Sequence, residues 1–188
     1  PRIDWMLSAR NDQATWLLLT AHSQVAVSEL NEVGDTLRFF QSRGGVTVLD
    51  TGIGWMRTNR ADQMTRIWAD VDLLIGTLNE LSFWSGLEHP EDIARRAMSV
   101  GVGKVVIKMG AEGAGWMSED GVYAHQPARR IEHSNVSVGA GDGFNATLIT
   151  QLIQGESLES AVNFAQIVAA KIVEIGNGVI GWGQTWKP

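Results

Sequence analysis

Cysteine is absent from the sequence, which excludes disulfide bonds and thiolate metal sites. No apolar run approaches the ~20 residues that a membrane-spanning helix requires. Basic residues are in the minority, 15 against 21 acidic ones, so the net charge is −6 and a binder of the nucleic-acid backbone is not expected. These absences suit a cytoplasmic protein that has neither nucleic acid nor a membrane among its partners.

Apolar residues, in contrast, are plentiful. They make up 44% of the 188 residues, enough to bury a sizeable core, and the length suits one domain or one large fragment of a domain. We find no internal repeat, linker or low-complexity segment. The sequence therefore predicts a single globular domain over residues 1–188.

Short apolar runs alternate along the chain with longer amphipathic ones. The short runs predict strands at Thr15–Ala21, Val46–Asp50, Asp72–Gly76 and Lys104–Gly110. The amphipathic runs predict helices at Ser23–Gly44, Asn59–Val71, Leu78–Gly86, Pro90–Gly101, Gly141–Gln154 and Leu158–Glu174. A hairpin is expected around Glu119–Gly121. Repeated strand-then-helix units predict an α/β fold, a three-layer α/β/α sandwich with a mainly parallel, Rossmann-like sheet.

Polar residues and glycines follow several of the predicted strands. Parallel sheets bind ligands outside the carboxyl ends of their strands. The candidate positions are Asp50, Thr77–Glu80, Lys108–Gly113 and Ser137–Asp142. Each lies just after a predicted strand or opens a helix, and this coincidence is the first indication of a site.

The most informative stretch is Gly139-Ala140-Gly141-Asp142, directly before a helical apolar pattern. Small residues leave the first amides of a helix uncovered, and these amides carry a partial positive charge that can hold a phosphate. Asp142 would repel a phosphate, but it suits a hydroxyl that must lose its proton during phosphoryl transfer. The plainer interpretation is a tight turn with an ordinary acidic residue at the helix start.

This stretch, continued as VGAGDGFNATLITQLIQGESLESAVNFAQIVAA, resembles the second signature of the ribokinase-like carbohydrate kinases of the phosphofructokinase B type. Upstream, DLLIGTLNELSFWSG resembles the segment with that family's Asn-x-x-Glu motif. KVVIKMGAEGAGWM resembles its nucleotide-site strand with Gly-x-x-Gly, and GGVTVLD its earlier strand ending in Asp. The resemblance runs from Thr15 to Ala170 in the correct order, and it implies a ribokinase-like fold.

The resemblance implies roles in phosphoryl transfer for the helix start. Asp142 matches the catalytic base that takes the proton from the acceptor hydroxyl. Gly139, Ala140 and Gly141 match the anion hole. The implied activity is ATP-dependent transfer of the γ-phosphoryl group to a hydroxyl of a sugar or sugar acid.

The resemblance also implies ATP and Mg²⁺ as cofactors. The positions matching the nucleotide site are Lys108, Gly110, Gly113, Ser137 and Gln166. Those matching the magnesium motif are Glu80, which would act largely through water, and Thr77.

Several positions depart from the family pattern. Val136-Ser137 stands in place of Asp-Thr before the anion hole, and Thr77 replaces the Asn of Asn-x-x-Glu. After Asp50 the family often continues Pro-Asn, whereas this chain has Thr51-Gly52. These departures bear on nucleotide affinity, magnesium handling and acceptor choice.

No counterpart of the family's opening strand, with its Gly-rich sugar-binding turn, or of its small β lid is seen in the sequence. We therefore expect a chain in which the lid region is absent, either a fragment or a protein that works differently. The family's lid often builds a dimer interface, so a homodimer is one assembly that the resemblance allows. A non-catalytic nucleotide- or metabolite-binding protein of the same fold, or a nucleoside kinase, is the alternative function.

Overall fold

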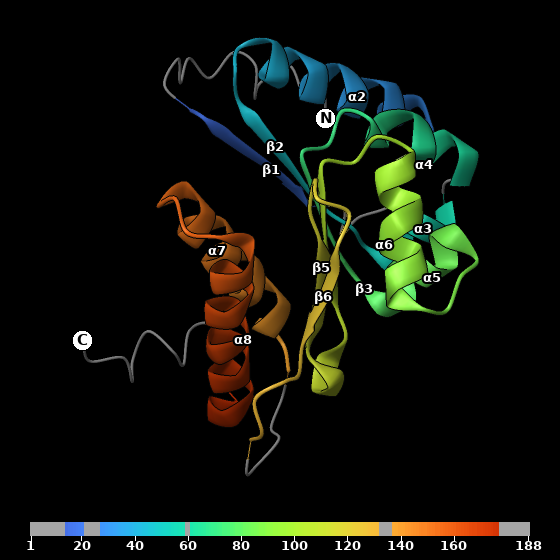
Figure 1. Cartoon of the computed structure of the whole chain (residues 1–188). Helices are drawn as coiled ribbons and strands as arrows, with labels where there is room; N and C mark the ends of the chain where they lie inside the picture. The colour runs from blue at the N-terminus through green and yellow to red at the C-terminus, as the bar shows by residue number, and fades with distance from the viewer. Residues whose placement is uncertain (1–13, 21–26, 59–60, 132–136, 177–188) are drawn as a thin grey trace. The chain divides into compact units, whose positions relative to one another are not determined.

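The computed structural model describes residues 14–20, 27–58, 61–131 and 137–176 (Figure 1). It divides into two compact units. Unit 1 comprises Pro1–Lys108 and Gly115–Ala124, and unit 2 comprises Met109–Ala114 and His125–Pro188. That the whole chain is one domain stays a prediction.

Six strands form one sheet in the order β1-β2-β3-β4-β5-β6. Their bounds are β1 Trp16–Thr20, β2 Val46–Asp50, β3 Leu73–Thr77, β4 Lys104–Lys108, β5 Ala114–Met117 and β6 Tyr123–Gln126. The first four strands are parallel, with Thr20 opposite Asp50, Asp50 opposite Ile75 and Thr77 opposite Lys108. Their carboxyl ends therefore meet at one edge of the sheet.

The parallel strands are apolar because the sheet interior is buried. Val48, Leu74, Ile75 and Val106 are fully buried, as expected for strands covered by helices. β-Branched and leucine side chains fill this core, and each of the four parallel strands ends on a polar residue, namely Thr20, Asp50, Thr77 and Lys108. The predicted strands are confirmed, although β4 ends two residues earlier than expected, because the Met109 N–H donates to the Gly113 carbonyl oxygen at 2.8 Å.

Among the described residues of unit 1 there are five helices: α2 Val27–Ser42, α3 Ile53–Thr58, α4 Ala61–Trp68, α5 Leu78–Ser85 and α6 Pro90–Ser99. Contacts join α2 to β2, α5 to β3, and α6 to β4. α3 was not predicted, because its six residues are flanked by Gly52 and interrupted by Gly54. The predicted helix starts at Ser23 and Asn59, and the predicted strand end at Ala21, lie outside the described residues.

Unit 2 contains a 3-10 turn, η1 Gly110–Glu112, and two long helices, α7 Ala140–Ile153 and α8 Leu158–Ile175. The two helices pack against each other along their length, and Gly143 makes this close approach feasible. A β-carbon at Gly143 would lie 2.2 Å from the Ile172 Cδ1 atom. Both helices were predicted, each to within a residue at its ends.

Candidate active site

The carboxyl ends of β2, β3 and β4 carry a set of interacting polar side chains in unit 1. We call it the strand-end cluster, and its members are Asp50, Thr51, Thr77, Glu80 and Lys108. Parallel pairing brings these chain segments together although they lie up to 58 residues apart in sequence. This is the edge at which a sheet of this kind binds ligands.

A buried ion pair joins the ends of β2 and β4. Lys108 Nζ lies 3.0 Å from Asp50 Oδ1, and the two side chains are only 15% and 2% exposed. Removing charges from water is costly, so each buried charge needs its partner. Lys108, a predicted nucleotide-binding residue, is thus held by Asp50. The sequence analysis had noted Asp50 only as a polar residue at the end of a predicted strand.

Glu80 closes the first turn of α5 in a capping box with Thr77. The Glu80 N–H donates to Thr77 Oγ1 at 3.3 Å, and the Thr77 N–H donates to Glu80 Oε2 at 2.8 Å. A second donor to this carboxylate comes from the residue after β2, because Thr51 Oγ1 donates to the same Glu80 Oε2 at 3.0 Å. One oxygen of this carboxylate therefore accepts hydrogen bonds from two separate segments.

The predicted magnesium residues, Thr77 and Glu80, do lie together. In the described part of the chain, no group of three or more His, Cys, Asp or Glu residues could hold a metal ion. Mg²⁺ commonly keeps several waters and takes only one or two carboxylates plus substrate phosphates. Glu80 fits that chemistry, because its second oxygen, Oε1, makes no hydrogen bond to any described residue. The capping role of Thr77 was readable from the Thr-x-x-Glu spacing.

In unit 2, the segment after β4 turns tightly through two glycines in the left-handed region. Gly110 has φ +59 and Gly113 has φ +101. A β-carbon at Gly113 would lie 2.0 Å from the Gln126 carbonyl oxygen, whereas one at Gly110 would have no described atom within 4 Å. Gly113 is thus required by close packing, and Gly110 leaves open backbone beside the turn. His125 Nε2 lies 2.8 Å from the Glu112 carbonyl oxygen and ties β6 to the same turn.

The start of α7 has the bare backbone that the sequence predicted. We call Gly139–Asp142 the helix-start segment. Gly139 is the N-cap, with φ +84, and no side chain among the described residues caps the helix there. The Gly143 N–H donates to the Gly139 carbonyl oxygen at 2.9 Å, which begins the helical ladder. Asp142 is exposed in the first turn.

The amides of the helix-start segment are not equivalent. The Ala140 N–H donates to the Ser137 carbonyl oxygen at 3.1 Å, so this amide has a partner within the chain. Ser137 therefore contributes its backbone to the turn, and both Ser137 and Gly141 are exposed. Val136, which replaces an acidic residue of the family pattern, lies outside the described residues.

Gln166 of α8 is buried, with 9% exposure, and its Nε2 atom donates to the Gln126 carbonyl oxygen at 3.2 Å. Its Oε1 atom is enclosed and has no hydrogen-bond partner in the described structure. An orphaned buried acceptor of this kind calls for an explanation. Because the protein encloses this atom, a ligand could reach it only after neighbouring atoms had moved.

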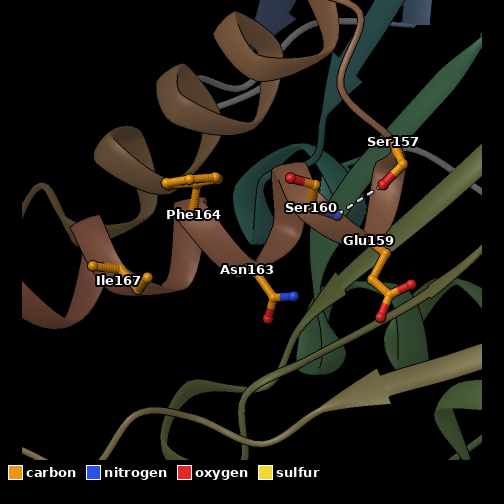
Figure 2. A pocket seen from close by; sticks show the side chains of 6 residues that line it. All are labelled: Ser157, Glu159, Ser160, Asn163, Phe164 and Ile167. Carbon is orange, nitrogen blue, oxygen red and sulfur yellow. Dashed lines mark hydrogen bonds between the residues drawn. The ribbon is translucent and has the colours of Figure 1, made fainter.

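A surface pocket lies along α8 and does not coincide with these residues. Figure 2 shows its six lining side chains, all from α8 and its N-cap: Ser157, Glu159, Ser160, Asn163, Phe164 and Ile167. Phe164 and Ile167 are 49% and 43% exposed. None of the predicted site residues lines this pocket.

The predicted residues thus fall into two groups. Thr77, Glu80 and Lys108 lie in unit 1, and the others lie in unit 2, namely Gly110, Gly113, Ser137, Gly139, Ala140, Gly141, Asp142 and Gln166. Sequence reasoning placed Asp50 among the candidate positions from its strand-end place and noted Thr51 only as a departure from the family pattern, without naming a partner for either. It did not find Gln126, which no local pattern marks.

Comparison with known proteins shows the family to which the chain belongs. The model of the family described as pfkB family carbohydrate kinase matches residues 44–180. Since this is most of the chain, the protein belongs to the pfkB family of carbohydrate kinases. A 1-phosphofructokinase of Escherichia coli K12 is 37% identical over 103 residues, which are 52% of this chain and 32% of the relative. The chain thus spans about a third of the length of that relative.

Solved structures agree on the fold. Arabidopsis thaliana ribokinase, complexed with ribose and ATP, has a TM-score of 0.75 at 22% identity, covering 90% of this chain and 53% of its own. A ribokinase II of Escherichia coli, in complex with ATP and Mg²⁺, has a TM-score of 0.70 at 20% identity, covering 85% of this chain and 52% of its own. The fold is therefore ribokinase-like, an α/β fold with a mostly parallel sheet, as the sequence predicted.

No helix in the described residues has the length and apolar character needed to span a membrane. The cytoplasmic location, the homodimer and the absence of nucleic-acid partners stay predictions.

Proposed function

We propose that this protein takes part in ATP-dependent transfer of the γ-phosphoryl group to a hydroxyl of a sugar or sugar acid. The observation that carries the proposal is the helix-start segment. A glycine N-cap without a side-chain cap precedes an exposed carboxylate in the first turn of α7. Membership of a carbohydrate kinase family, and a relative named 1-phosphofructokinase, support the same reaction class.

Asp142 is the general base in this proposal. A carboxylate in the first helical turn can accept the proton of an attacking hydroxyl. The amides at the helix start present partial positive charge to the transferred phosphoryl group, and positioning with charge stabilisation is most of what this reaction requires. Gly139 has φ +84 and lacks a β-carbon, which keeps the backbone approachable there.

The nucleotide is proposed to lie against unit 2, near Gly110, Gly113, Ser137 and Gln166. The open backbone at Gly110 supports this placement. In unit 1, Lys108 is held by Asp50 and is a cation of the kind that binds phosphates, which agrees with the role that the family resemblance implies for it. Bound Mg²⁺ would neutralise phosphate charge, with Glu80 holding it through water.

The test is a kinase assay of the chain with Mg-ATP on a panel of pentoses, hexoses, their monophosphates and sugar acids, in which ADP release and product phosphate are measured. Calorimetry with Mg-ATP runs beside it. Acceptor-dependent ADP release is the expected result. Nucleotide binding without turnover on any acceptor would favour a binding protein of the same fold, and turnover only on nucleosides would reassign the acceptor class.

A further inference from the structure

Two positions at which this chain departs from its family pattern contact one residue, Glu80. Thr51 replaces a residue that is often proline, and Thr77 replaces an asparagine. In the structure both contact the carboxylate or backbone of Glu80. We propose that Thr51 is a positioning residue for Glu80, which orients this carboxylate toward a metal-bound water. The inference rests on the proposed function, in which Glu80 organises Mg²⁺.

The hydrogen bond from Thr51 is separate from the helix cap. The capping box of α5 is complete with Thr77 and Glu80 alone, since each side chain accepts from the other's backbone N–H. Thr51 comes from the end of β2 and adds its hydroxyl at 3.0 Å to an oxygen that already has a donor at 2.8 Å. A helix start does not require this second donor. The bond satisfies the buried Thr51 hydroxyl, and it also fixes one oxygen of the Glu80 carboxylate.

The effect of two donors on one oxygen is to fix the carboxylate group. A glutamate side chain has several rotatable bonds, and ordering it costs conformational entropy. With Oε2 held by Thr51 and Thr77, the Oε1 atom has a defined direction and accepts no hydrogen bond from any described residue. Oxygen ligands and water-mediated carboxylates are what Mg²⁺ prefers.

The surroundings hold the Thr51 hydroxyl in place. The Thr51 N–H donates to the Ile75 carbonyl oxygen at 2.8 Å, and the side chain is buried with 1% exposure. Gly76 provides the space, because a β-carbon there would lie 2.3 Å from Thr51 Oγ1. The glycine at the end of β3 and the threonine after β2 are thus matched, and together they deliver one hydroxyl to Glu80.

The test compares Thr51→Val, which keeps the shape and removes the hydroxyl, with Thr51→Ser, which keeps the hydroxyl. Thr36→Val is the matched control, since Thr36 is 4% exposed and its hydroxyl donates to the Glu32 carbonyl oxygen at 2.7 Å in α2. The probe is Mn²⁺, titrated in the presence of a non-hydrolysable ATP analogue and followed by electron paramagnetic resonance and calorimetry. Nucleotide binding without metal is measured on the same samples.

Thr51→Val is expected to weaken Mn²⁺ binding about 10-fold, as for other residues that orient a metal ligand, and to leave metal-free nucleotide binding unchanged. Thr51→Ser and Thr36→Val should match the parent chain. Glu80→Gln keeps an acceptor for the helix cap and removes the charge, so it should weaken Mn²⁺ binding too. Adding Thr51→Val to Glu80→Gln should then have no further effect, because both act through one carboxylate.

Unchanged Mn²⁺ binding in Thr51→Val, or additive losses in the double variant, would overturn the proposal. If Thr51→Val does not fold, Thr51→Ala serves as the second variant, with the same expected loss; failure of both to fold would make the hydroxyl a folding element and reject its positioning role. The readout needs no acceptor. If no sugar is phosphorylated but the variants still change Mn²⁺ affinity as expected, only the proposed activity is rejected. If the parent chain does not bind Mn²⁺ in the presence of nucleotide, this inference is rejected.

Discussion

The strand-end cluster of unit 1 is built from side chains, whereas the helix-start segment of unit 2 is built from backbone. In the cluster, Lys108 is held by Asp50, and Glu80 by Thr51 and Thr77. At the helix start, Gly139 carries no side chain and Asp142 is exposed. The strand-end cluster has its geometry fixed by hydrogen bonds within the protein, whereas the helix-start segment is proposed to offer backbone donors to a ligand.

The difference indicates how each region tolerates change. Removing one member of a bonded pair in the strand-end cluster, such as Asp50 of the Lys108–Asp50 ion pair, costs stability because its partner loses an interaction in a buried setting. A backbone site with an exposed carboxylate loses activity and little stability. Stability and activity measurements on variants of the two regions should therefore separate cleanly.

The largest expected effect is kinetic and concerns Asp142. Asp142→Asn should lower kcat by about 10²–10⁴-fold, because a general base contributes that much to a proton-transfer step. Nucleotide binding and the melting temperature should stay close to those of the parent. The control is Glu159→Gln, an exposed acidic residue in the first turn of α8, which should retain full activity. Comparable activity of Asp142→Asn and the parent would reject the base assignment.

The next effect is on stability and concerns the buried ion pair. Asp50→Asn should destabilise the fold by about 3 kcal/mol, because it leaves the Lys108 ammonium without the Asp50 carboxylate in a buried setting. Chemical denaturation measures this loss, and Lys108→Met in the Asp50→Asn background should recover part of it. Asp35→Asn is the matched control, since its ion pair with Arg38 is exposed. An equal loss from both variants would contradict the burial argument.

A smaller effect distinguishes the two glycines of the turn in unit 2. Gly113→Ala should destabilise the fold by about 2 kcal/mol, because it combines a left-handed φ with a clash against the Gln126 carbonyl oxygen. Gly110→Ala should cost about 1 kcal/mol, the strain of the left-handed conformation alone. Thermal melts measure both. If Gly110→Ala nevertheless weakens Mg-ATP binding more than its stability loss explains, the open backbone at Gly110 is part of the nucleotide site.

The smallest effect is a pH dependence at Tyr123 of β6. Burial, with a further contribution from Glu91, raises the pKa of Tyr123 above its ordinary value of 10.0. In the unfolded chain the Tyr123 hydroxyl therefore loses its proton at a lower pH than in the folded protein. The stability that the neutral hydroxyl contributes is fully present below pH 10.0 and declines as the pH rises above that value. Tyr123→Phe should remove this component of the alkaline decline. The Tyr123 hydroxyl is also buried without a partner in the described structure, so the variant should be no less stable at neutral pH. A marked loss at pH 7 would show that the hydroxyl has a partner after all.

Much of the fold could be predicted from the sequence, because strand and helix periods depend on neighbouring residues. β2 matches its predicted bounds, since Val46–Asp50 is a β-branched run closed by a polar residue and a glycine. α3 could not be predicted, because six residues with Gly54 among them are too short for a helical period to emerge.

The site was less predictable, because its contacts join residues far apart in the chain. The spacing of Thr77 and Glu80 is local in the sequence. It was interpreted as part of a magnesium motif, and it also encodes a helix cap. The pairing of Lys108 with Asp50 depends on sheet order, which no window of sequence contains. The hydroxyl of Thr51 has room beside Glu80 because Gly76 lacks a β-carbon, and this depends on tertiary packing that the sequence does not reveal.

Gly143 has a consequence for the chemistry of its neighbour. It follows Asp142 directly and lies against Ile172, so the spacing of α7 and α8 is set one residue away from the proposed base. A larger residue at 143 would meet the end of the Ile172 side chain, which would have to move or let the two helices shift. If Asp142 is the base, apolar substitutions at this contact are therefore expected to alter turnover while every polar group of the proposed site stays unchanged.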